Sequence, residues 1–104
     1  MIIWSEQLYM DEIAKRQKEK VQEHIKKGRL QFPFFLIILP TNPCNLLDII
    51  SVNDLRFSYY KKKQIKVLGM AGSRRYAKII AAAIVAHVYE KTGDFQIAKW
   101  YGLD

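Results

Sequence analysis

The chain has 104 residues, of which 50% are hydrophobic and 26% are charged. This length and composition fit one globular domain and exclude a disordered chain, which would contain far fewer large apolar residues. The formal net charge of +7 favours polyanionic partners but also serves solubility alone, and the single Cys excludes an intrachain disulfide.

The first expected element is a helix from about Gln7 to Lys27. Apolar side chains recur there at helical spacing, whereas the rest of the surface carries charges of both signs, several of them four residues apart. Gly28 then supplies a left-handed C-terminal cap. We interpret the charged surface as a solvated face. The single domain, residues 1–104, thus divides into an N-terminal amphipathic helix (1–28) and an α/β core (29–104).

Two strands are expected next. The continuous apolar run Phe32–Leu39 is typical of a strand covered on both faces, and Leu46–Ile50 predicts a second strand. The residues between them, 40–45, are rich in turn formers, so the two strands are expected to form a hairpin. Cys44 lies in this turn without a neighbouring base, and we expect it to be inert.

The second half of the chain alternates helix and strand. Ser51 and Asp54 have the spacing of a capping box, which predicts a short helix from Val52 to about Tyr60. A third strand is expected over residues 65–70, and a long helix begins at Gly72 and Ser73 and runs to about Lys91. Residues 95–98 are interpreted as an edge strand or a loosely packed turn.

The order α-β-β-α-β-α predicts an α/β (α+β-like) fold: a small mixed sheet of three or four strands with helices packed on it. The crossover between the second and third strands makes them parallel. Their carboxyl ends, where open α/β sheets bind ligands, then place Ser51 and residues 69–75 at one edge.

An anion-binding site is the first functional hypothesis, at that edge. Helix amides and the helix dipole favour an anion there, and arginines add direct contacts. The segment lacks the glycine motifs of phosphate-binding loops, so an ordinary turn with Ser73 as the N-cap is the alternative. The candidate residues are Ser51, Asn53, Gly72, Ser73, Arg74 and Arg75.

A nucleic-acid site is the second hypothesis, because aromatic and basic residues alternate near the end of the short helix. In the alternative interpretation, the tyrosines pack on the sheet and the lysines complement the helix C-terminus. The candidate residues are Tyr59, Tyr60, Lys61, Lys62 and Lys63.

The last helix has an apolar surface on all sides, since only His87 is polar between Lys78 and Glu90. Such a helix is expected to be buried all round, so either the first helix or a second copy of the chain must cover its outer side. The second of these alternatives, a second copy of the chain, predicts a homodimer. The candidate interface residues are Ile79, Ala82, Ala83, Ala86 and Tyr89.

Catalytic residues, metal sites and cofactors are not expected. His24 and His87 are distant in sequence, and metal-ligand spacings are absent. The N-terminal residues do not resemble a signal peptide, and no apolar stretch is long enough to span a bilayer, so we expect a cytoplasmic protein. The leading functional hypothesis is a non-enzymatic binding module that self-associates. The alternatives are a nucleic-acid-binding accessory protein and a small enzyme acting on a phosphorylated ligand.

Overall fold

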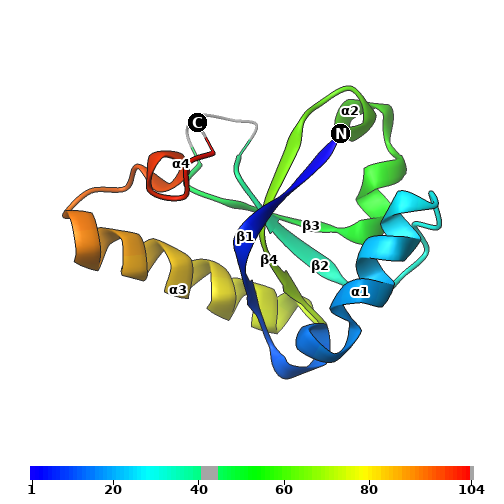
Figure 1. Cartoon of the computed structure of the whole chain (residues 1–104), viewed down its shortest axis with the longest axis horizontal. Helices are drawn as coiled ribbons and strands as arrows, with labels where there is room; N and C mark the ends of the chain where they lie inside the picture. Colours follow the sequence, from blue (N-terminus) through cyan, green and yellow to red (C-terminus); the bar gives the residue numbers. More distant parts are fainter. Residues whose placement is uncertain (41–44, 104) are drawn as a thin grey trace.

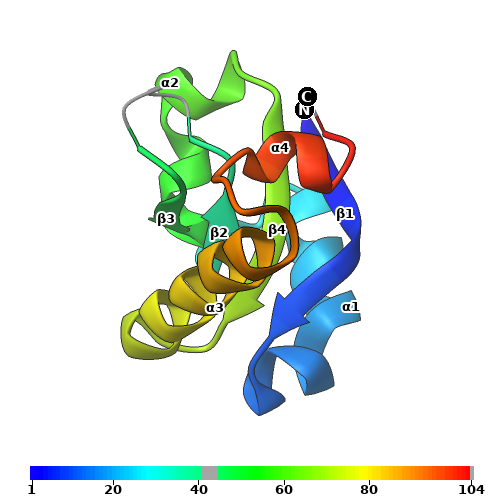
Figure 2. The same cartoon turned by 90° about the vertical axis from the view of Figure 1, so that its left-hand side faces the viewer.

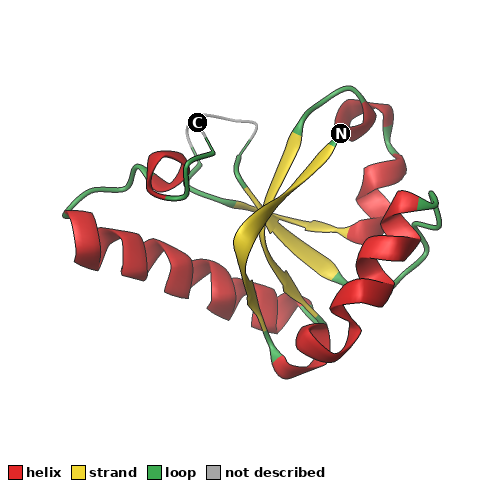
Figure 3. Cartoon of the chain, in the orientation of Figure 1, coloured by secondary structure: helices red, strands yellow, loops and turns green. Residues whose placement is uncertain are grey.

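The computed structural model describes residues 1–40 and 45–103, which form a mixed sheet with helices on both of its faces (Figures 1 and 3). The strands lie in the order β1-β4-β2-β3; β1 is parallel to β4, and β2 is antiparallel to both β4 and β3. Their bounds are β1 Ile2–Met10, β2 Phe35–Ile38, β3 Asp48–Ser51 and β4 Ile65–Ala71. The expected α+β class with a small mixed sheet is therefore confirmed. The turn expected over Thr41–Cys44 lies outside the described residues.

The N-terminal strand corrects the expectation of a helix beginning near Gln7. Residues 2–10 pair with β4, more than 55 positions later in the chain, and helix α1 begins only at Glu12 and ends at Lys26. The carboxylate of Asp11 accepts a hydrogen bond from the amide of Ala14 at 2.8 Å and caps this helix. Met10 fits the apolar spacing of the helix, but it packs against the core from the strand.

Gly69 allows β1 to approach β4 closely. A side chain at this position would place its Cβ 2.7 Å from the backbone oxygen of Tyr9, closer than a real Cβ contact allows. The pairing register between β1 and β4 shifts just before this point, between Trp4 and Tyr9. The missing side chain of Gly69 therefore leaves the space in which β1 pairs with β4.

Two hydrophobic clusters lie on the two faces of the sheet. Successive residues of β2 alternate between them, as the pleat requires: Leu36 and Ile38 join one cluster, whereas Ile37 joins the other. Helix α1 and the 3₁₀ helix η1 (Val52–Arg56) cover the first face. Helices α3 (Arg74–Thr92) and α4 (Ile97–Trp100) cover the second face.

The local signals at helix ends are largely confirmed. Gly28 has φ +73°, and the amides of Gly28 and Arg29 donate to the carbonyls of Ile25 and His24, which is a Schellman motif. Ser51 and Asp54 form the expected capping box. The helix that follows is wrong in extent, because the extended backbone of Phe57 separates η1 from a second short helix, α2 (Ser58–Lys61).

The C-terminal segment is a short helix rather than an edge strand. Ile97 is 3% exposed and packs into the cluster beneath α3, so its burial anchors α4 against the sheet. The fourth strand of the sheet is β1 instead. Within the described part of the chain, none of the helices has the length and apolar character needed to cross a membrane.

Candidate functional site

The outer face of α3, defined by the five predicted interface residues, is exposed. Ile79 and Tyr89 are 55% and 51% exposed, and the alanines between them also face away from the sheet. The buried residues of the helix are Ala77, Ile84 and Val88, all on its opposite side. Because α1 packs on the other face of the sheet, it does not cover this surface (Figures 1 and 2).

A shallow, open depression lies beside this outer face, between α3 and the segment that leads into β3. Its lining is mainly apolar, and Leu46 lies on the side away from the helix. The rings of Tyr89 and Phe95 stack at 4.9 Å with an interplanar angle of 18° and form one end. The outer face therefore combines a ridge of small residues with large side chains around it.

Charged residues are arranged asymmetrically along α3. Arg74, Arg75 and Lys78 are exposed in its first half. Glu90 and Lys91 are exposed in its last turn, and Asp94 is exposed just beyond its end. Within the described residues, neither Lys78 nor Glu90 takes part in a salt bridge. One end of the outer face is thus basic, and the other end carries the acidic groups.

The two strand ends that make up the predicted anion-binding edge lie on the same side of the sheet. Ser51 and Ala71 both pair with Phe35, so the ends of β3 and β4 lie at the same edge of the sheet, with β2 between them. This confirms the expected parallel direction of the two strands, although they are not neighbours.

The polar groups at this edge, however, have partners within the chain. The Gly72 amide donates to the carboxylate of Asp11 at 3.0 Å, and the Ser73 hydroxyl accepts from the amide of Tyr76 at 3.2 Å. The side-chain oxygen of Asn53 accepts from the backbone amide of Phe32 at 3.3 Å. The backbone amide of Asn53 donates to the Ser51 hydroxyl at 3.1 Å. The Arg74 guanidinium lies 5.0 Å from the ring centre of Phe35, and Arg75 is exposed.

Asp11 is a residue that the sequence analysis missed. Its carboxylate takes the place at the Gly72 amide that an external anion would otherwise occupy, and it also caps α1. An acidic residue directly before an apolar periodic run is a recognised signal for the start of a helix. These contacts favour the capping-turn alternative for residues 72–75.

The predicted nucleic-acid residues form a corner around α2, which we call the α2 corner: Arg56, Phe57 and residues 59–63. The ring of Tyr60 is half-buried against the core, and this burial, with the charges of Asp54 and Asp48, raises the pKa of Tyr60. Tyr59 packs edge-on against it at 5.0 Å, and the ammonium of Lys63 lies 4.9 Å from the Tyr59 ring centre. Lys61, Lys62 and Lys63 are exposed.

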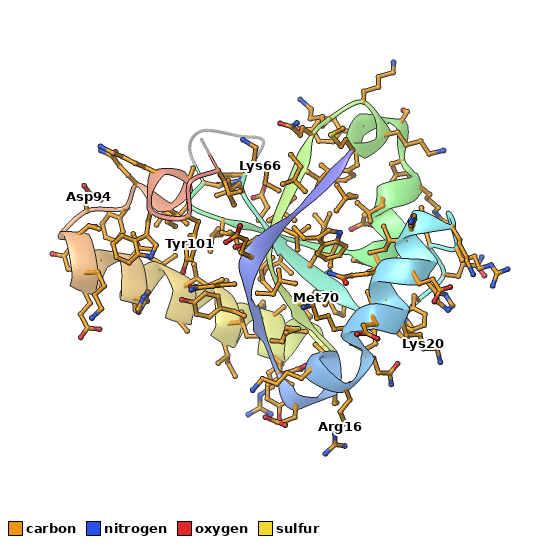
Figure 4. The ribbon with its side chains drawn as sticks, in the orientation of Figure 1. Arg16, Lys20, Lys66, Met70, Asp94 and Tyr101 are labelled. Atoms are coloured by element: carbon orange, nitrogen blue, oxygen red, sulfur yellow. The ribbon has the colours of Figure 1, made fainter. Side chains whose placement is uncertain are left out.

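A cavity of about 630 Å³ lies between the first residues of β4 and helix α4. We call it the lysine cavity, after the side chains that define it. Lys66 extends from β4 (Figure 4), and its ammonium donates to the backbone oxygen of Leu103. The polar residues that line the cavity are Lys63, Lys66, Lys99, Asn45, Gln64 and Gln96.

The two histidines lie on opposite faces of the sheet, each beside an aromatic ring. The ring centres of His24 and Phe32 lie 4.6 Å apart, with the rings tilted by 43°, on one face of the sheet. The ring of His87 lies 6.0 Å from the ring of Trp100 on the other face. Among residues 1–40 and 45–103, no group of three His, Cys, Asp or Glu side chains could hold a metal ion.

A partly buried polar contact joins the first strand to the C-terminal segment. The hydroxyl of Tyr101 donates to that of Tyr9 at 2.8 Å, and the two rings meet edge to face. Burial, together with this hydrogen bond, raises the pKa of Tyr101 well above its usual value. The contact is structural, since it fastens the segment after α4 to β1.

No family model, curated protein or solved structure matches this chain.

Proposed function

We propose that this protein is a non-enzymatic interaction module that forms a homodimer through the outer face of α3. The observation that carries the proposal is the exposed apolar surface of this helix, which extends from Ile79 to Tyr89 without an intervening charge on that side. Contiguous exposed apolar surface of this kind marks interaction sites on folded proteins.

The shape of the surface suits a second helix. Ala82 and Ala86 lie four residues apart on the side of the helix opposite the buried Ile84, at the centre of the exposed face. Small side chains at that spacing let the backbone of another helix approach closely. Ile79 and Tyr89 flank them and supply large apolar area for burial.

The order of residues along α3 matches an isologous contact, in which the same patch serves both subunits. An antiparallel pair related by a two-fold axis at the level of Ile84 brings Ile79 to the level of the partner's Tyr89. The same axis brings Ala82 to the level of the partner's Ala86. Large side chains then meet at the two ends of the contact, and small ones meet at its centre.

The charges favour a second copy of this chain as the partner. The same antiparallel arrangement brings Lys78 to the level of the partner's Glu90. The basic start of each helix then lies beside the end of the other, where Glu90 and Asp94 outnumber Lys91. Opposite charges across an interface select the partner and its orientation. An antiparallel pair also places the helix dipoles in favourable opposition. The anion-binding edge is not part of this proposal, because the Gly72 amide already binds Asp11.

The double substitution Ala82→Glu with Ala86→Glu tests the proposal. Two carboxylates at the centre of the contact would be buried without partners in the dimer, so we expect a monomer by size-exclusion chromatography with light scattering. Both positions are exposed within one chain, so the helical circular dichroism should be unchanged.

A matched control places two glutamates on the other helix. Lys15→Glu with Lys26→Glu changes exposed positions of α1 and adds at least as much negative charge. This variant should remain dimeric. If the control and the α3 variant dissociate equally, a general charge effect rather than the outer face of α3 governs association, and the proposal is wrong.

A further inference from the structure

The lysine cavity has the chemistry of an anion site. Three lysine side chains and three side-chain amides line it, and no acidic side chain does so within the described residues. Lys66 already donates to Leu103, and the side-chain amides of Asn45 and Gln64 donate to Asp48 and Met1. The donors on which the site depends are therefore Lys63, Lys99 and Gln96. Lysine ammonium groups and amide N–H groups are donors to phosphate oxygens. The remaining lining is apolar and includes Pro40, Leu46 and Phe95.

The size of the cavity fits a ligand group rather than a single ion. Its volume of about 630 Å³ lies within the range of about 300–1,000 Å³ that is usual for ligand pockets. It is far larger than an isolated phosphate needs, so a phosphate in it would leave room for the atoms attached to that phosphate.

Lys63 belongs both to the lining of the cavity and to the α2 corner. This residue lines the cavity, and its ammonium lies 4.9 Å from the ring centre of Tyr59. Phe57 and Tyr59 each expose about half of their surface, at 51%. The Arg56 guanidinium lies 5.5 Å from the ring centre of Phe57, so each of these rings has a cation beside it.

We propose that the lysine cavity and the α2 corner together bind single-stranded nucleic acid. The lysines neutralise backbone phosphates, and the rings of Tyr59 and Phe57 stack on unpaired bases. Basic grooves beside aromatic platforms are the general means by which proteins hold single strands. The net charge of +7 supplies long-range attraction for such a polyanion. This proposal does not depend on the homodimer, because none of these residues belongs to the outer face of α3.

The test is fluorescence anisotropy with labelled single-stranded oligothymidine and oligouridine of about 20 nucleotides. We expect binding at about 50 mM salt and much weaker binding at about 200 mM, because phosphate contacts release counterions. A duplex of the same length should bind more weakly, since its bases are not available for stacking. Absence of binding at low salt, or equal affinity for the duplex, would overturn the proposal.

Two sets of variants separate the roles of the residues. Lys63→Gln with Lys99→Gln should weaken binding about tenfold and reduce the slope of log K against log salt by about 1.4, or 0.7 for each lost phosphate contact. Phe57→Leu with Tyr59→Leu should weaken binding about tenfold while leaving that slope unchanged, because stacking releases no counterions. Lys66 is left intact because it also binds Leu103.

The control removes the same charge elsewhere. Lys15→Gln with Lys26→Gln changes two exposed lysines of α1, and its affinity should stay within about twofold of the unmodified chain. Circular dichroism confirms that each variant is folded. If the control loses as much affinity as the cavity variant, binding follows net charge alone, and the assignment of a site is wrong.

Discussion

Helices α1 and α3 perform the same task on opposite faces of one sheet, but their outward surfaces differ. Each buries a few residues completely, including Val21 in α1 and Ile84 in α3. The outward side of α1 is charged and contains salt bridges such as Glu23–Lys27 at 2.8 Å, which lowers the pKa of Glu23. The outward side of α3 is apolar instead.

This difference shows how much of a helix surface must be apolar for the fold to form. A helix that covers a sheet needs one apolar stripe, and α1 shows that a charged outer side is compatible with this fold. Covering the sheet therefore does not require the second apolar side of α3, and the proposed homodimer would bury it. Substitutions on the two helices, and on the two faces of the sheet that they cover, test this difference.

The buried stripes should behave alike. Ile84→Ala in α3 is expected to lower the free energy of unfolding by about 3 kcal/mol, and Val21→Ala in α1 by about 2 kcal/mol, because both side chains are fully buried. Urea denaturation at a fixed protein concentration measures both changes. A loss under about 0.5 kcal/mol for either variant would mean that the helix concerned does not pack on the sheet as described.

The two N-caps should differ. Asp11→Ala removes the cap of α1 and also leaves the Gly72 amide without its acceptor, so we expect a loss of about 2 kcal/mol. Ser73→Ala removes only the cap of α3 and should cost about 1 kcal/mol. Thermal or urea unfolding distinguishes them. Equal losses would indicate that the bond from Gly72 to Asp11 adds nothing to stability.

The charges at the ends of α3 should affect association more than folding. Lys78→Glu is expected to weaken the dimer up to about fivefold, since exposed ion pairs contribute about 0.2–1 kcal/mol each. Adding Glu90→Lys should restore the affinity, whereas Lys27→Glu on α1 should leave it unchanged. Sedimentation velocity measures these dissociation constants. Failure of the double variant to recover would argue against the antiparallel arrangement.

Alkaline pH should reveal a smaller difference between the two faces. The folded-state pKa of Tyr101, on the α3 side, lies well above the value of about 10 in the unfolded chain. Below pH ~10 the Tyr101 hydroxyl is neutral in both the folded and the unfolded chain. Above pH ~10 it ionises in the unfolded chain but not in the folded chain, so the free energy of unfolding falls as pH rises. The urea midpoint should therefore decrease above pH ~10, and less steeply in Tyr101→Phe. An identical pH profile in that variant would refute this role.

Local signals in the sequence predicted much of this fold. The apolar run that contains β2, the body of α1, the glycine cap at Gly28 and the capping box at Ser51 depend on neighbouring residues, and each is present. Strand β1 was missed because its partner is β4, and pairing across such a separation leaves no local periodicity. Phe57 interrupts the expected helix for a different reason, because its backbone is extended and the spacing of residues does not indicate this.

The candidate surfaces were predictable to different degrees. Helical periodicity alone placed Ile79, Ala82 and Ala86 together, and the structure adds that α1 lies on the other side of the sheet. The lysine cavity could not be predicted, because Lys66 and Lys99 are brought together only when Ile97 anchors α4 against the sheet. The Gly72 loop was interpreted as an anion site because the sequence does not show that Asp11 reaches its amide.

Sedimentation equilibrium of the unmodified chain tests the outer face of α3 most directly. Over protein concentrations from roughly 1 to 200 µM, we predict a reversible shift from the chain mass of 12.2 kDa to twice that mass. The same experiment on Ala82→Glu with Ala86→Glu should give the chain mass throughout. A single species of 12.2 kDa at every concentration of the unmodified chain would contradict the homodimer.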